Sequence, residues 1–96
     1  MDRNGKKLLD SASQAINDRG ENYDTPERNF TRIAKLWSVV LGKDVTALEV
    51  GLCMDLVKTA RLISTPNHYD SLLDKAGYVA CMAELKTFLP CNQEKD

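Results

Sequence analysis

Two aspartates placed four residues apart are the side chains with the clearest chemical potential. Asp70 and Asp74 belong to a helix that the apolar spacing predicts over residues 67–89. Residues four apart share one side of a helix, about one turn from each other. The predicted solvent face of this helix, roughly 100° away, holds Ser71, Lys75 and Lys86. We therefore expect the two carboxylates on a semi-buried face.

Like charges one turn apart repel, so such a pair is expected to share a cation. An all-oxygen ligand set favours Mg²⁺ or Mn²⁺ over zinc, and we predict Mg²⁺ at Asp70 and Asp74. Lys58 and Arg61, three residues apart on the preceding predicted helix, could supply the positive charge instead. These four side chains would then be ion pairs that hold the two helices together, and the spacing leaves both readings open.

Two further residues are candidates for ligand chemistry. His68, just before the aspartates, could contact a phosphate or act as an acid or base, or simply begin the helix. Tyr23, in a predicted loop over residues 19–24, could bind a ligand or cover the core. The chain has three cysteines, one histidine and no Cys-x-x-Cys pair, so no zinc site is expected.

Four helices are predicted to position these residues, which makes the fold all-α. Their ranges are 6–18, 26–41, 47–63 and 67–89. Thr25 and Gly42 have the residue types expected before and after the second helix. Thr46 and Glu49 match a capping box for the third. Only a short Pro-containing loop joins the last two helices, so we expect them to pack antiparallel in a four-helix bundle.

The third predicted helix is apolar nearly all round, which is typical of a central helix or of a subunit interface. A chain of 96 residues cannot cover such a helix well, and we expect a homodimer or homotetramer. Residues 1–90 are expected to form a single domain, with a flexible tail at 91–96.

Charge and hydropathy exclude several classes of partner. The formal net charge is −1 and no basic stripe is present, so nucleic acid is not an expected partner. No apolar run reaches the roughly 20 residues that cross a bilayer, and the first seven residues lack the apolar core of a signal peptide. We therefore expect no membrane partner and a cytoplasmic location.

Several segments resemble a phage and prophage protein family of unassigned function. The resemblance covers about residues 15–85, through Arg-Gly-Glu-Asn-Tyr at 19–23, Asn29-Phe30, Leu36-Trp37, 56–62 and 68–78. The most specific pieces are Lys-x-x-Arg-Leu from Lys58 and Asp-x-x-x-Asp-x-x-Gly-Tyr from Asp70. Both also resemble the MazG-like all-α nucleoside triphosphate pyrophosphohydrolases.

That resemblance implies four-helix subunits that assemble as dimers or tetramers in the host cell cytoplasm. It implies a magnesium site at Asp70 and Asp74 that holds a nucleoside triphosphate or a related nucleotide for attack by water. The ligand would be bound by Lys58, Arg61, Tyr23 and Tyr78. His68 would serve as the catalytic acid or base.

One departure from the superfamily pattern favours an alternative. Active MazG-like enzymes carry clustered glutamates on an earlier helix, whereas the second predicted helix here has no acid after Glu27. Glu49 and Asp55, on the third, lie about 240° apart around the axis and share no face. The alternative is a non-catalytic protein that sequesters a nucleotide signal or inhibits a host protein.

Overall fold

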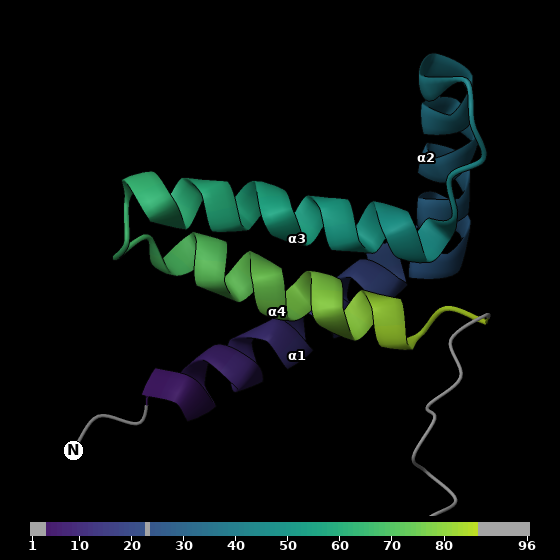
Figure 1. Ribbon diagram of the computed structural model, residues 1–96. Coiled ribbons are helices and arrows are strands. Elements are labelled where there is room, and N and C mark those ends of the chain that lie inside the picture. The colour runs from purple at the N-terminus through teal and green to yellow at the C-terminus, as the bar shows by residue number, and fades with distance from the viewer. Residues whose placement is uncertain (1–3, 23, 87–96) are drawn as a thin grey trace, which may run out of the picture.

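The structure is a computed structural model that describes residues 4–22 and 24–86. For residues 18–22 it describes the backbone alone. Four α-helices make up the described chain, which confirms the all-α prediction (Figure 1). They are α1 (Asn4–Asn22), α2 (Pro26–Leu41), α3 (Ala47–Ser64) and α4 (Tyr69–Ala83). None of these helices is both long and apolar enough to cross a membrane.

Helix α4 lies at the centre of the arrangement. It packs along α3, and the two run antiparallel, as predicted from the short loop between them (Figure 1). Helix α1 packs on another side of α4, while α2 stands steeply against the start of α3. Over the described residues α1 and α2 do not pack on each other, so the four helices form an open assembly.

The predicted helix ends depend on side chains that bond to free backbone groups. The Thr25 hydroxyl accepts a hydrogen bond from Arg28 N at 3.2 Å, and Gly42 ends α2 with a left-handed φ of 68°. Thr46 and Glu49 bond to each other's backbone N–H at 2.9 and 3.1 Å, which is the predicted capping box. Local sequence therefore fixes where α2 and α3 begin.

Two predicted boundaries are wrong. Helix α1 continues to Asn22, past Gly20, because one glycine weakens a helix by about 1 kcal/mol without ending it. Helix α4 ends at Ala83 and not at residue 89, since Glu84 and Leu85 donate to carbonyls three residues back and the chain turns inward. Leu85 is buried by that turn. The predicted flexible tail lies outside the described residues.

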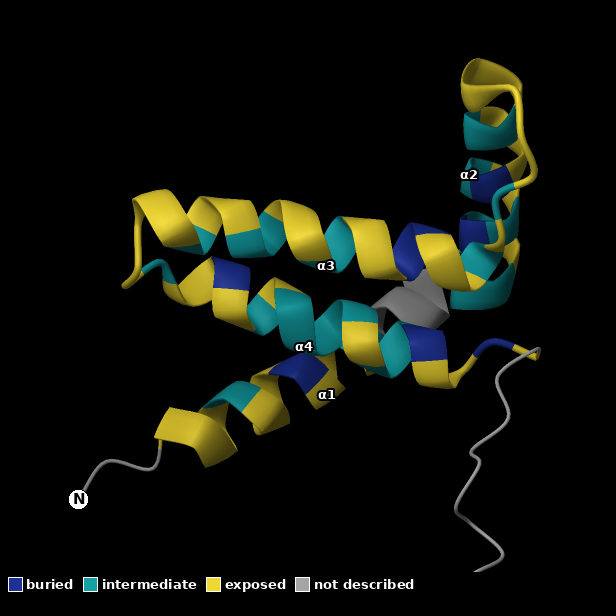
Figure 2. Cartoon of the chain, in the orientation of Figure 1, coloured by how far each residue is buried: buried dark blue, intermediate teal, exposed yellow. Residues whose placement is uncertain are grey.

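The core is small and lies where α2, α3 and the end of α4 meet (Figure 2). Its buried members are Phe30, Ala34, Val50, Met82 and Leu85. Several large apolar side chains are exposed, among them Val40 at 82% and Leu9 at 63%. The reason is the open assembly, which leaves the far half of α2 and much of α1 without a neighbour.

Candidate functional site

The structure reverses the two predicted faces of α4. Ser71 is only 1% exposed and Lys75 is half-buried against α3, whereas Asp70 and Asp74 lie on the exposed side. The prediction failed because Ser71 and Lys75 are residue types that usually face water. Here each has a polar partner that allows it to be covered.

An ion pair joins two of the predicted site residues. Lys58 Nζ lies 3.0 Å from Asp74 Oδ2, across the α3–α4 contact. This bears out the predicted contact between Lys58 and Asp74. The two residues stand eight positions before and after Pro66, which is the register that an antiparallel hairpin with a turn at that proline gives.

A second cross-helix pair was not predicted. Lys75 Nζ lies 3.0 Å from Asp55 Oδ1 and donates to Thr59 Oγ1 at 2.6 Å. The covered Asp55 Oδ1 atom has no hydrogen bond among the described residues, so the ionic contact with Lys75 is its compensation. The hairpin register that explains Lys58 and Asp74 could have indicated this pair too.

Arg61 makes a different contact from the predicted one. Its Nη2 lies 3.3 Å from His68 Nε2, and His68 Nδ1 lies 2.7 Å from Ser71 Oγ. Asp70 has no ion pair among the described residues. Arg61 and His68 therefore meet at the α3–α4 turn, one helical turn from Lys58 along α3.

A cleft of about 670 Å³ opens between α1 and α2, over α4. Asp74 and Tyr78 line it, so two predicted site residues share this hollow. Its apolar wall includes Ile16, Phe30, Ile33, Met54 and Leu73. Its polar lining includes Asn17, Asp24, Glu27, Asn29 and Glu84. Tyr23, which was also predicted to bind a ligand, lies outside the described residues.

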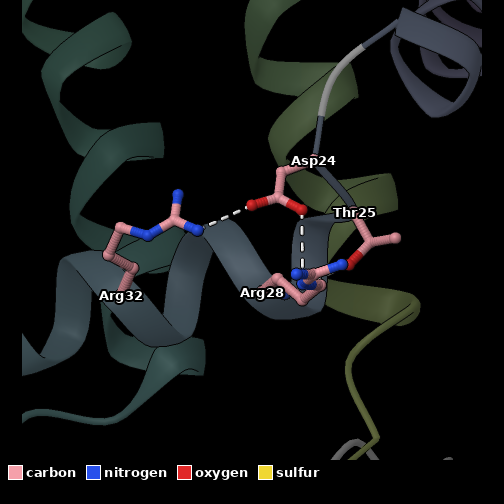
Figure 3. A network of polar contacts seen from close by, with 4 residues as sticks. All are labelled: Asp24, Thr25, Arg28 and Arg32. Carbon is pink, nitrogen blue, oxygen red and sulfur yellow. Dashed lines mark hydrogen bonds and ion pairs between the residues drawn. The ribbon is translucent and has the colours of Figure 1, made fainter.

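Asp24, on the rim of the cleft, is held by two arginines (Figure 3). Arg32 Nη2 lies 2.7 Å from its Oδ2, and Arg28 Nε lies 3.4 Å from its Oδ1. The hydrogen bond from Arg32, together with the charges of both arginines, lowers the pKa of the Asp24 carboxyl from its usual value. Asp24 is therefore a fixed anion, already compensated within the chain.

Glu27, which also lines the cleft, holds two segments together through its carboxylate. Its Oε1 accepts a hydrogen bond from Lys86 N at 2.7 Å, which ties the segment after α4 to the first turn of α2. Its Oε2 accepts from Thr31 Oγ1 at 3.2 Å. Both oxygens are thus engaged. Sequence reasoning missed Glu27 as a cleft residue, because its link to Lys86 spans 59 positions.

The acids left to hold a cation in the cleft are Asp74 and Glu84. Asp74 has Lys58 beside it, and the Glu84 carboxylate has no ion-pair partner in the described part of the chain. No group of three or more His, Cys, Asp or Glu side chains converges among the residues described.

Comparison with known proteins identifies the family. Residues 7–86 match the model of a domain of unknown function, DUF6378. The chain belongs to this family. It is 37% identical over 81 residues to the Gene 55 protein of Mycobacterium phage D29 and 32% identical over 81 residues to that of phage L5.

These alignments cover 83% and 82% of the chain, but only 54% and 52% of the two phage proteins. The chain thus spans about half the length of the curated relatives it matches. No solved structure matches it. The predicted resemblance to a phage family is confirmed.

Proposed function

We propose that the chain binds a nucleoside triphosphate or a related nucleotide together with Mg²⁺, in the cleft between α1 and α2. The observation that carries the proposal is the position of Asp74. Asp74 lines the cleft and also forms an ion pair with Lys58, so one carboxylate of the cleft has an amine 3.0 Å away. A metal-bound phosphate needs groups of both signs close together.

The size and lining of the cleft support a ligand of this class. Small-molecule sites commonly have volumes of about 300–1,000 Å³, with apolar walls and a few polar groups that fix orientation. The cleft has about 670 Å³, with Phe30 and Tyr78 as aromatic side chains to contact a base. The amides of Asn17 and Asn29 can both donate and accept, as recognition of a base edge requires.

A bound Mg²⁺ ion would offset the negative charge of the cleft. Its carboxylates would repel a polyphosphate, and Asp24 already has both arginines. A Mg²⁺ ion on Asp74 would reverse the local charge and bridge to phosphate oxygens. Lys58 would then lose its partner on Asp74 and be available to the phosphate. His68, Arg61 and Asp70 do not line the cleft, so we assign them no contact with the bound nucleotide.

The proposal is for binding of the nucleotide in the first place, and for its hydrolysis only in the second. Water attack on a phosphoanhydride is driven by positioning and by stabilisation of the developing charge. Asp74 and Lys58 supply part of the charged groups that such a reaction needs. Glu84 is a further carboxylate in the lining of the cleft. Sequestration of a nucleotide needs only the binding part. A host protein as target stays an alternative with no specific observation in its favour.

The test is ligand-induced stabilisation, measured with the four common nucleoside triphosphates, each with and without Mg²⁺. A ligand that binds only the native state raises the melting temperature. We expect a rise that needs Mg²⁺ and is lost in Asp74→Asn, while Asp70→Asn keeps it. Release of pyrophosphate or phosphate in the same samples measures hydrolysis.

A steric variant separates the cleft from the charge pair. A Cβ at Gly77 would meet no atom within 4 Å, so Gly77→Leu should fold and fill the cleft. It should lose the Mg²⁺-dependent stabilisation, while Gly5→Leu, equally unobstructed but outside the cleft, should keep it. Equal stabilisation of both variants would overturn the assignment of the cleft.

A further inference from the structure

We propose that the outer face of α3 pairs with the same face of a second copy, antiparallel, around a two-fold axis. The face consists of six exposed residues over about 17 Å of helix: Leu52, Cys53, Leu56, Val57, Ala60 and Ile63. They lie on the side of α3 opposite the α4 contact (Figure 2). Four of these six residues, Leu52, Leu56, Val57 and Ile63, are large hydrophobic side chains.

The face carries no charge, because every charged side chain of α3 is engaged inside its own chain. Asp55 and Lys58 pair with α4, and Arg61 contacts His68. Glu49 is occupied by the capping box at the start of the helix. In a two-fold contact each residue lies close to the same residue, or a near neighbour, of the other copy. Charged residues on the face would therefore meet like charges and weaken the dimer, whereas an uncharged apolar face would not.

The spacing fits a helix-to-helix contact. Leu52, Leu56 and Ile63 are separated by four and seven positions, which keeps them on one seam. Ala60 lies beside that seam and is small enough to allow two helices to approach.

The position of α2 selects the antiparallel arrangement. In Figure 1, α2 rises past the N-terminal end of α3 on the side away from α4. Two α3 helices laid parallel would bring two α2 helices to the same end. Laid antiparallel, each α3 has its free C-terminal end beside the α2 of the other copy.

The outer α3 face supplies part of the area that a dimer needs. A half-exposed leucine or valine leaves roughly 50–100 Å² of apolar surface in water, so the four large side chains of this face reach on the order of 300 Å². Helix α2 also leaves Leu36, Val39, Val40 and Leu41 exposed. Those on the side of the partner add to this area, toward the ~800 Å² that each partner contributes to a standard interface.

Light scattering after gel filtration tests the proposal on the full chain. We expect twice the chain mass of 10.7 kDa at micromolar concentration. Leu56→Glu should give the monomer mass with its helical circular dichroism retained, because Leu56 is 62% exposed and outside the core. Leu9→Glu is the matched control at 63% exposure on α1, and it should remain a dimer. A monomeric wild type, or a Leu56→Glu dimer, overturns the proposal.

Disulfide trapping tests the antiparallel register. A two-fold axis that passes between Leu56 and Val57, within the face, puts Cys53 opposite residue 60 of the other copy. In a Cys91→Ser background, Ala60→Cys should form an interchain disulfide under mild oxidation, and adding Cys53→Ser should abolish it. Cross-linking that persists without Cys53 would indicate a parallel pairing and contradict the antiparallel one.

Discussion

Gly51 of α3 lies directly against the side chain of Met82 on α4. A Cβ built at Gly51 would collide with Met82 Cγ and would also reach Phe30 Cε2 at 3.3 Å. The glycine is fully covered, and Phe30 and Met82 belong to the buried core. The contact between α2, α3 and α4 therefore depends on the absence of a side chain at this position.

The first prediction is that Gly51→Ala destabilises the protein. Alanine is favoured over glycine in a helix by about 1 kcal/mol, but a methyl group forced into a filled core costs typically 1–3 kcal/mol. We expect a net loss of about 1 kcal/mol in urea unfolding. Gly77→Ala, on α4 with open space around its Cβ, should gain stability instead. If both variants gain, Met82 must move aside without loss of packing.

The second prediction concerns acid unfolding. The pKa of Asp24 lies below its usual value in the folded state, mainly because Arg32 donates a hydrogen bond to the carboxylate. Its stabilising contribution is therefore complete above the ordinary value of about 3.8 and is lost as the pH falls through the lowered folded pKa. In Asp24→Asn the free energy of unfolding should therefore fall less steeply below about pH 4 than in the wild type.

Arg32→Gln provides the matched variant for this acid limb. It removes the largest cause of the lowered pKa while leaving the Asp24 carboxyl in place. Urea midpoints measured at several pH values should fall less steeply with acid than in the wild type. The effect should be smaller than in Asp24→Asn, because Arg28 remains beside Asp24. An acid limb as steep as that of the wild type in both variants would show that the cluster in Figure 3 contributes nothing.

The helix ends that carry local caps could be predicted from the sequence, whereas the buried face of α4 could not. The boundaries at Thr25, Gly42 and Thr46 depend on bonds within a few residues, which one local segment determines. Which side of α4 meets α3 depends on the packing of the two helices, where a serine and a lysine took positions that apolar residues usually occupy. Ser71 is covered there because His68 bonds to it.

The candidate site shows the same division. The contact between Lys58 and Asp74 follows from the hairpin, whose turn at Pro66 sets the register. The cleft that Asp74 lines also requires residues from α1 and the first turns of α2, and no local pattern relates those segments. Glu27, with a partner 59 positions away, could be placed only by the fold.

The third prediction is that the neutral His68 ring carries its proton on Nδ1. The Arg61 guanidinium can only donate, so the His68 Nε2 atom 3.3 Å away must accept. The Nδ1–H group then donates to Ser71 Oγ at 2.7 Å. Long-range ¹H–¹⁵N correlation spectra of the ring should show this tautomer. Arg61→Met should shift the population toward the common Nε2–H form, and an Nε2–H form already in the wild type would contradict the assignment.

The last prediction ranks the two ion pairs between α3 and α4. Lys75→Met removes the cation that compensates the covered Asp55 Oδ1 atom among the described residues, and an unsatisfied buried acceptor costs about 1–3 kcal/mol. Lys58→Met leaves Asp74, whose side chain is 46% exposed and can be solvated by water, so the loss should stay below about 1 kcal/mol. Urea unfolding at pH 7 measures both.

Asp55→Asn should rescue much of the Lys75→Met loss, since a neutral amide needs no cation. Asp74→Asn should change Lys58→Met little. This order would mean that the fold depends on Lys75 and can spare Lys58, as the proposed role of Lys58 in phosphate binding requires. The opposite order would make Lys58 and Asp74 the pair that holds the hairpin together, and any loss of nucleotide binding in Asp74→Asn would then follow from unfolding.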